Sequence, residues 1–258
     1  LLLARRLVEA GVRLVTLGGF AVHRDGRPLP DSAFGRQKAR ALLAMLACAR
    51  GAVHREALVD GLWPDLSAKR GLAALNSTLY ALRRGLEPEL AAGDSSSLVV
   101  AEGPTYRLVL GEADSWDAAD FLARARAALA APGDVDALLA AEAAWTGPFL
   151  PEWTFAPWTE PLRTELGEAH RAVLVGAAEA LAAAGRAEEA ISRYRLLLAM
   201  EPEREGWHRA LMRVYARAGE RGLALRQFEA CRRALREGLG VEPSRETRDL
   251  HAELLREG

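Results

Sequence analysis

The clearest chemical signal in the sequence is a set of cationic and hydrogen-bonding side chains at helical spacing between Ser67 and Leu86. Five leucines mark one buried helical stripe by alternating three and four residues apart: Leu72, Leu75, Leu79, Leu82 and Leu86. At about 100° per residue, the outer side of the same helix carries no acid, and its residues are Lys69, Arg70, Ala73, Asn76, Ser77, Tyr80, Arg83 and Arg84. Because a solvated helix normally mixes both signs of charge, this face predicts contact with DNA phosphates and base edges.

The net charge of the whole chain hides two parts of opposite sign. All 258 residues together carry a formal charge of −1, but residues 1–111 hold 15 Lys and Arg against 10 Asp and Glu, a net of +5. The remainder holds 19 against 25, a net of −6. Between Gly35 and Leu86 there are nine basic and three acidic residues, so the positive charge is concentrated around the predicted helix.

Catalytic and metal-binding patterns are missing from the sequence. The five histidines lack cysteine or acidic partners at metal-ligand spacing, and they are His23, His54, His170, His208 and His251. The segment GLGVEPS at 238–244 follows a helical pattern and lacks the Gly-Lys-Ser ending of a phosphate-binding loop. We therefore expect no enzyme activity, no cofactor and no metal site.

Cysteine usage and hydropathy predict a cytoplasmic protein with no membrane partner. Cys48 and Cys231 each sit inside a helical pattern, which favours buried, reduced thiols. Apolar runs stay well short of the roughly 18 residues of a membrane span. Residues 1–11, which lack an initiator Met, are interpreted as the tail of an upstream helix or a linker, and the chain as a fragment of a larger protein.

Residues 12–111 are predicted to form an α+β domain that positions the basic helix. The expected strands are 12–17, 20–24, 27–29 and 53–54, and the expected helices are 35–50, 55–62 and 67–86. Runs at 98–101 and 106–110 flank a Gly-Pro tip and predict a closing hairpin. Two helices joined by a short turn, with a basic second helix, are typical of a helix-turn-helix, and the hairpin makes it a winged helix.

The segments LYALRRGL (79–86) and TYRLVL (105–110) resemble the recognition-helix end and wing strand of OmpR-type DNA-binding domains. Those domains usually carry Gly before the wing tyrosine, where this chain has Thr105. Three more cations begin the first helix, Arg36, Lys38 and Arg40, and either contact phosphate or form a solvated face. Tyr80 either stacks on a sugar or covers the helix face.

Residues 112–258 are predicted to form an all-α domain of tetratricopeptide-like repeats. Helical patterns cover 115–131, 134–145 and 157–184, and two similar segments open at Gly185 and Gly219, 34 residues apart. Ala190 and Tyr194 recur at this offset as Ala224 and Phe228. Aromatic residues between 147 and 158 predict a core that links helices, or alternatively a partner site: Phe149, Trp153, Phe155 and Trp158.

A winged helix followed by GPFLPE (147–152) and ALRQFEACRRALREGLGVEPSRETR (224–248) resembles the Streptomyces antibiotic regulatory protein (SARP) family of transcriptional activators. The resemblance implies a bacterial transcriptional activator domain, homodimeric binding to direct repeats in double-stranded DNA and recruitment of RNA polymerase. Arg70, Ala73, Asn76 and Ser77 would face bases, Arg83 and Arg84 would face phosphates, and Pro104-Thr105 would approach the minor groove. The alternative is an interaction scaffold whose winged helix does not read DNA.

Overall fold

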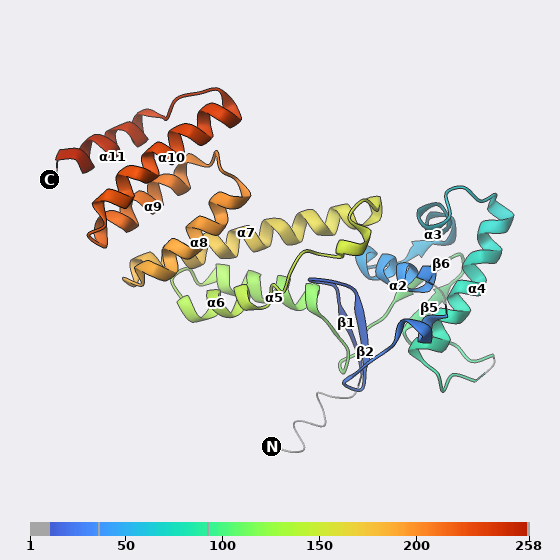
Figure 1. The fold of residues 1–258 in the computed structure, drawn as a ribbon. Helices are drawn as coiled ribbons and strands as arrows, with labels where there is room; N and C mark the ends of the chain where they lie inside the picture. The colour runs from blue at the N-terminus through green and yellow to red at the C-terminus, as the bar shows by residue number, and fades with distance from the viewer. Residues whose placement is uncertain (1–10, 36, 92, 257–258) are drawn as a thin grey trace, which may run out of the picture. The chain divides into compact units, whose positions relative to one another are not determined.

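The computed structural model describes residues 11–35, 37–91 and 93–256, which form two compact units (Figure 1). Unit 1 contains the described residues up to Leu122 together with Trp145–Leu166, and unit 2 contains Ala123–Ala144 and the described residues from Gly167 onward. Two helices, α5 (Asp117–Ala130) and α7 (Glu160–Ala183), therefore run from one unit into the other. The two units are defined by which parts of the chain pack together, whereas the predicted domain boundary after residue 111 was drawn from composition. That boundary stays a prediction.

Unit 1 begins with a four-stranded sheet in the order β3-β2-β1-β7, whose strands are β1 (Val12–Val15), β2 (Ala21–Arg24), β3 (Arg27–Pro28) and β7 (Ser115–Trp116). The expectation of a helix from residue 115 was wrong at its first two residues, because β7 pairs parallel with β1. Two long-range contacts hold it there. The Asp117 carboxylate accepts bonds from the backbone N–H groups of Thr16 and Leu17, and the Trp116 indole N–H donates to Thr16 Oγ1 at 2.9 Å.

Three helices form the centre of unit 1: α2 (Gln37–Ala49), α3 (Arg55–Leu62) and α4 (Ala68–Leu86). A short 3-10 helix, η1 (Asp31–Phe34), precedes them. Every residue of α2 from Ala41 to Ala47 is buried, because α3, α4 and the later segment around Trp158 all pack against this alanine-rich and leucine-rich helix. Arg36, expected in the first turn of α2, lies outside the described residues.

The predicted leucine stripe of α4 faces the core. Four of its leucines are at most 3% exposed and Leu72 is half-buried. Two glycines let α4 approach its neighbours closely: a Cβ at Gly71 would lie 2.3 Å from Val59 Cγ1 of α3, and one at Gly85 would lie 2.8 Å from the Ala33 carbonyl oxygen. Both positions are therefore restricted to glycine by packing.

A second sheet forms the wing, in the order β4-β6-β5, from β4 (Val53–His54), β5 (Val99–Glu102) and β6 (Thr105–Leu108). Gly103 turns the hairpin with φ of 59°, a left-handed conformation that glycine adopts without strain. The predicted hairpin is confirmed, with β5 and β6 each shifted by a residue or two from the expected runs.

The segment 145–159 packs on unit 1 and contains two 3-10 turns, η2 (Pro151–Trp153) and η3 (Pro157–Thr159). Phe149 is buried and bridges to Leu17, and the Trp153 ring lies edge-on to Phe20 with centroids 5.2 Å apart. Phe155, in contrast, is 96% exposed. The predicted aromatic core is therefore correct for Phe149 and Trp153 but wrong for Phe155.

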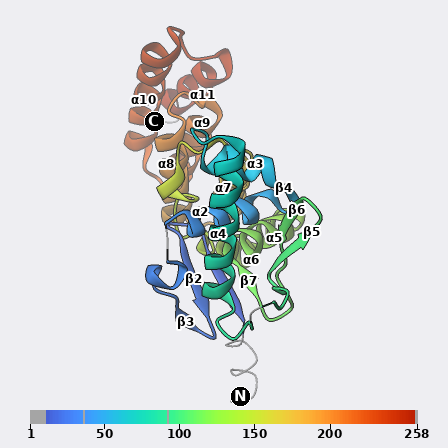
Figure 2. The same ribbon diagram turned by 90° about the vertical axis from the view of Figure 1, so that its right-hand side faces the viewer.

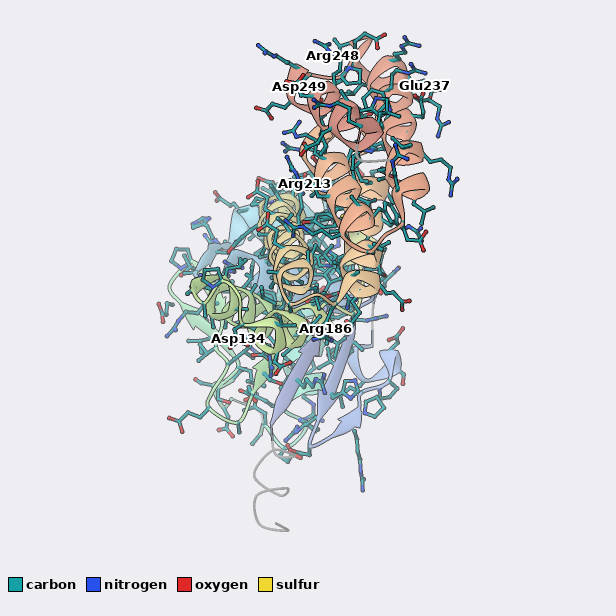
Figure 3. All side chains as sticks on the ribbon, turned by 90° about the vertical axis from the view of Figure 1, so that its left-hand side faces the viewer. Asp134, Arg186, Arg213, Glu237, Arg248 and Asp249 are labelled. Carbon is teal, nitrogen blue, oxygen red and sulfur yellow. The ribbon has the colours of Figure 1, made fainter. Side chains whose placement is uncertain are left out.

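Unit 2 is helical, with α6 (Val135–Ala143), α8 (Ala187–Met200), α9 (Glu205–Arg217), α10 (Arg221–Leu239) and α11 (Arg245–Arg256) joining parts of α5 and α7. The repeated small and large pairs are all buried, Ala190 with Tyr194 and Ala224 with Phe228. Charged side chains cover the outside, among them Arg213, Glu237 and Arg248 (Figure 3). The predicted helical repeat is confirmed.

Both cysteines are free, and burial raises the pKa of each thiol to about 12. Cys231 is buried and Cys48 is half-buried, so both thiols stay protonated at neutral pH. Within residues 11–35, 37–91 and 93–256, none of the helices combines the length and apolar character needed to cross a bilayer. In the same ranges, no group of three or more His, Cys, Asp or Glu side chains is arranged to hold a metal ion.

Candidate nucleic-acid interface

The outer side of α4 is an exposed stripe that crosses the front of unit 1 in Figure 2. Tyr80 is its largest apolar group and is 68% exposed. The helix contains no acidic residue. Its exposed predicted site residues are Lys69, Arg70, Ala73, Asn76, Ser77, Tyr80 and Arg84. The fold thus brings seven of the predicted residues onto one side of a helix that contains no acid, and we call these seven residues the α4 stripe.

Hydroxyl groups near the middle of α4 bond back to the helix. Ser77 Oγ donates to the Ala74 carbonyl oxygen at 2.9 Å, and Thr78 Oγ1 donates to the same oxygen at 2.8 Å. Thr78 is buried and Ser77 is exposed. Ser77 therefore keeps the lone pairs of its oxygen available toward solvent, where they can accept hydrogen bonds.

Three of the cations that were predicted to contact phosphate are already bonded to other residues of unit 1. Lys38 Nζ donates to the Leu62 carbonyl oxygen at the end of α3 and lies 5.9 Å from the centroid of the Trp63 ring. Arg40 pairs with Asp31 at 2.6 Å and donates to the Phe20 carbonyl oxygen at 2.7 Å. Both cations fasten α2 to its neighbours, so they are not free to move onto DNA without breaking these bonds.

Arg83 is the third engaged cation, because its guanidinium donates twice to the Val99 carbonyl oxygen, at 3.0 and 3.3 Å. It ties α4 to the wing strand β5. Arg84, one residue on, is exposed, and its Nη1 lies 3.5 Å from the Leu90 carbonyl oxygen. Arg84 is therefore the better placed of the two for an external phosphate.

A carboxylate fixes the connection between α4 and the wing. Glu87 accepts from Ser96 Oγ, from Ser97 Oγ at 2.6 Å and from the Ser97 backbone N–H at 2.9 Å. Burial acts to raise the pKa of Glu87, but these hydrogen bonds outweigh it and hold the pKa below its ordinary value. Glu87 stays ionised at neutral pH and keeps the wing in register with α4.

The wing tip is organised by local bonds. Thr105 is half-buried, donates through Oγ1 to the Glu102 carbonyl oxygen at 2.9 Å, and pairs with His54 of β4. Arg107 pairs with the Glu102 carboxylate at 2.8 Å. Pro104 is exposed at the tip, so it is the more accessible of the two residues predicted to approach a minor groove.

Arg55 is a candidate that sequence reasoning missed. It is exposed at the first position of α3, and its backbone N–H donates to the Pro104 carbonyl oxygen at 2.9 Å. Its guanidinium has no hydrogen bond or ion pair to other described residues. No local pattern indicates this role, because only the long-range pairing of β4 with β6 brings α3 to the wing.

The comparisons with known proteins agree with this architecture. A family model described as "Bacterial transcriptional activator domain" matches residues 113–255, more than half of the chain. The chain belongs to the bacterial transcriptional activator domain family. Its similarity to "Transcriptional regulatory protein MoaR1" of Mycobacterium tuberculosis is 31% identity over 253 residues, covering 95% of this chain and 80% of that protein.

Two further proteins resemble this member of the bacterial transcriptional activator domain family. "Regulatory protein AfsR" of Streptomyces coelicolor is 31% identical over 256 residues, and the match covers 96% of this chain but 24% of AfsR. The solved structure of "Mycobacterium tuberculosis EmbR in complex with low affinity phosphopeptide" has a TM-score of 0.78 at 29% identity, covering 96% of this chain and 65% of that chain. The chain is therefore shorter than both.

These similarities confirm the predicted SARP-type architecture, a winged helix joined to a helical activator domain. The family match begins at Ala113, next to β7, and continues to the end of α11. The relatives are named as transcriptional regulators, so this chain is a member of a family of transcriptional regulators.

Proposed function

We propose that this chain is a sequence-specific regulator that binds double-stranded DNA with α4 in the major groove. The observation that carries the proposal is the α4 stripe, which is exposed, basic and free of acid, on a helix whose other side is fixed in the core. A major groove accepts one α-helix, and phosphate contacts supply most of the affinity.

Each part of the surface has a separate role in the proposal. Arg70, Ala73, Asn76 and Ser77 face base edges, where arginine pairs with guanine and asparagine with adenine. Arg84 and Arg55 meet phosphates, because their guanidinium groups are exposed and lack carboxylate partners among the described residues. Pro104 approaches the minor groove. Lys38, Arg40 and Arg83 position the helices that carry the surface.

We further infer that the protein activates transcription as a homodimer on direct repeats near a promoter and recruits RNA polymerase. Membership of the bacterial transcriptional activator domain family supports activation. Paired binding is favoured by the stripe itself, since few long side chains on α4 can read bases, and two copies double the number of contacts.

The first test is a fluorescence titration of duplex DNA with the full chain at several salt concentrations. Arg84→Ala should weaken binding to all sequences alike and lower the slope of log K against log salt by about 1, because one phosphate contact is lost. Arg124→Ala is the matched control, since Arg124 is an exposed arginine on α5 and is not part of the α4 stripe. An unchanged slope for Arg84→Ala would remove this residue from the phosphate contacts.

The second candidate function is a protein-interaction scaffold whose winged helix does not read DNA. Phe155 favours it, because this residue is 96% exposed on a turn that hydrogen bonds from Arg163 hold in place, where its ring is accessible to a partner. The same titration separates the two functions: a wild-type chain with no salt-dependent binding to any duplex would favour the scaffold.

A further inference from the structure

A hollow on unit 1 lies beside the C-terminal half of α4. Its volume is about 360 Å³, and it is bordered by α4, by the turn that follows α4 and by the wing strand β6. Three residues of the α4 stripe line it, Asn76, Tyr80 and Arg84, and Tyr106 lines it from β6. The turn contributes Asp94. An acidic residue therefore borders the same space as the arginine that we assign to a phosphate.

Asp94 is exposed, and hydrogen bonds within its own turn fix its position. Its backbone N–H donates to the Ala91 carbonyl oxygen at 3.2 Å, and its carboxylate oxygen Oδ2 accepts from the Ala91 backbone N–H, also at 3.2 Å. This carboxylate has no other hydrogen bond to the described residues, and no ion pair joins it to Arg84. Asp94 therefore presents a negative charge that no described cation neutralises.

The other carboxylates near the end of α4 are compensated. A second hollow, of about 450 Å³, shares Leu90 and Asp94 with the first. Each of its remaining acidic residues has a hydrogen bond or ion pair outside its own turn, and they are Asp25, Glu87, Glu89 and Asp114. Glu89, for example, pairs with Arg24 at 2.7 Å. The uncompensated carboxylate of this region is thus the one that also borders the α4 stripe.

Arg84 is the cation that this carboxylate affects. Its Nη1 lies 3.5 Å from the Leu90 carbonyl oxygen, so its guanidinium extends toward the turn that carries Asp94. A phosphate bound by Arg84 would therefore lie at the hollow, close to a second negative charge. Like charges repel over a screening length of about 10 Å at about 0.1 M salt. The repulsion opposes the attraction between Arg84 and the phosphate.

We infer that Asp94 acts through Arg84 as a positioning residue that weakens the hold of this arginine on a DNA phosphate, an inference that rests on the proposed function for the ligand. Arg70, Ala73 and Ser77, which are proposed to face bases, do not line the hollow. Asp94 thus lowers the part of the affinity that is the same for every sequence. Fewer copies of the protein are then held on DNA that offers no matching bases.

The test compares the full chain and its variants in a fluorescence titration of a random-sequence DNA duplex at low salt. Asp94→Asn removes the charge but keeps an oxygen for the Ala91 N–H, and it should strengthen binding by about two- to fivefold. Asp94→Glu keeps the charge and should bind as the wild type does. Asp120→Asn is the matched control, because Asp120 is an exposed aspartate on α5 of unit 1 that does not line the hollow. It should leave the affinity close to that of wild type.

A second measurement separates repulsion from a structural effect. The gain from Asp94→Asn should shrink as the salt concentration rises. It should also be smaller in the Arg84→Ala background than in the wild type, because the two residues act on one phosphate. These results, with circular-dichroism spectra that match wild type, support the inference.

Other outcomes overturn it. Equal affinities of Asp94→Asn and Asp120→Asn, tighter binding by Asp94→Glu as well, or the same gain with and without Arg84 would each show that Asp94 does not act through this arginine. A wild-type chain that binds the duplex while Asp94→Asn leaves its affinity unchanged overturns this inference alone. A wild-type chain that binds no duplex at any salt concentration overturns the proposed function, and this inference with it.

Discussion

Arg83 and Arg84 are adjacent in the sequence but have different partners. Arg83 is half-buried and donates twice to the Val99 carbonyl oxygen, whereas Arg84 is exposed. Hydrogen bonds to a charged group contribute about 1.5–3 kcal/mol each in proteins, so Arg83 could reach a phosphate only by giving up much of the link between α4 and the wing. Arg84 would give up only its 3.5 Å contact to the Leu90 carbonyl oxygen. It is therefore the residue of the pair that we assign to DNA.

This difference marks the limit of prediction at single residues. The exposed side of α4 was predictable, because the leucine spacing fixes which side is buried and the remaining residues must face outward. The engagement of Lys38, Arg40 and Arg83 was not predictable, since their partners are backbone carbonyl oxygens of Leu62, Phe20 and Val99, which any residue type would provide. The exposed guanidinium of Arg55 was missed for a different reason, because only the long-range pairing of β4 with β6 brings the start of α3 to the wing.

Ser77 offers a test of base reading. Because its hydroxyl donates to the Ala74 carbonyl oxygen, its free lone pairs can only accept, and the base donors in a major groove are adenine N6 and cytosine N4. Ser77→Ala should relax the preference for such a base at one position, by about 1 kcal/mol or fivefold. Selection of bound sequences from a random library measures this change.

Ser67→Ala is the matched control for Ser77→Ala. Ser67 is exposed at the start of α4, and its side chain makes no capping hydrogen bond. The selected motif should therefore stay the same in this control. Recovery of the wild-type motif from Ser77→Ala as well would show that Ser77 does not read a base.

At the scale of elements, local patterns predicted the helices α2, α3 and α4 and the wing hairpin, but not the short 3-10 helix η1. The bounds of α3 and the end of α4 match the expectations, because Trp63-Pro64 and Glu87-Pro88 interrupt the helical pattern. The strand β7 was missed, because two residues carry no periodicity and their pairing partner β1 lies about 100 residues earlier. The Asp117 contacts to Thr16 and Leu17, together with the Trp116 indole bond to Thr16 Oγ1, fix that register.

The close packing of α4 against α3 at Gly71 gives a prediction about α4 as a whole. Gly71→Ala adds a Cβ that would lie 2.3 Å from Val59 Cγ1, so α4 must move away from α3. Replacing a helical glycine by alanine normally gains up to about 1 kcal/mol, and overpacking costs about 1–3 kcal/mol. The net result should be a loss of up to about 2 kcal/mol, measured by urea unfolding of the full chain.

Two further variants make the Gly71→Ala result specific. Gly167→Ala in α7 should stabilise the protein by about 0.5–1 kcal/mol, because a Cβ there meets nothing within 4 Å. The double variant Gly71→Ala with Val59→Ala should lose less stability than the two single changes together, since removing Val59 Cγ1 makes room for the new methyl group. Strict additivity would show that α3 and α4 do not compete for this space.

For the whole molecule, the buried titratable groups separate the responses of the two units to acid. Burial lowers the pKa of His170 from 6.5 to about 4 and also lowers the pKa of His208, and both histidines belong to unit 2. In unit 1 the pKa of Glu87 is lowered from 4.5 by its serine contacts despite the opposing effect of burial. As the pH is lowered, unit 2 should therefore begin to lose stability before the Glu87 contacts of unit 1 weaken.

The direction in which the stability of unit 2 changes with pH follows from proton binding. Below pH 6.5 the unfolded chain protonates His170 while the folded chain does not, until the pH approaches about 4, so unfolding becomes more favourable through this window. Carboxyl groups whose pKa is lowered affect stability at a lower pH, because Glu87 loses its stabilising contacts only as the pH falls below 4.5. The midpoint temperature of the unit 2 transition in thermal unfolding should therefore decrease as the pH is lowered from 6.5 to 4.5. The midpoint temperature of the unit 1 transition should decrease only at lower pH.

The variant that isolates this effect is His170→Asn, which cannot titrate in the window. Its unit 2 transition should fall less than that of wild type between pH 6.5 and 4.5, whatever its stability at pH 7, because one proton uptake on unfolding is gone. His23→Asn on β2 of unit 1 controls for removing a histidine and should leave the unit 2 transition unchanged. An identical pH response in His170→Asn and wild type would place the acid sensitivity of unit 2 elsewhere, with His208 as the next histidine to replace.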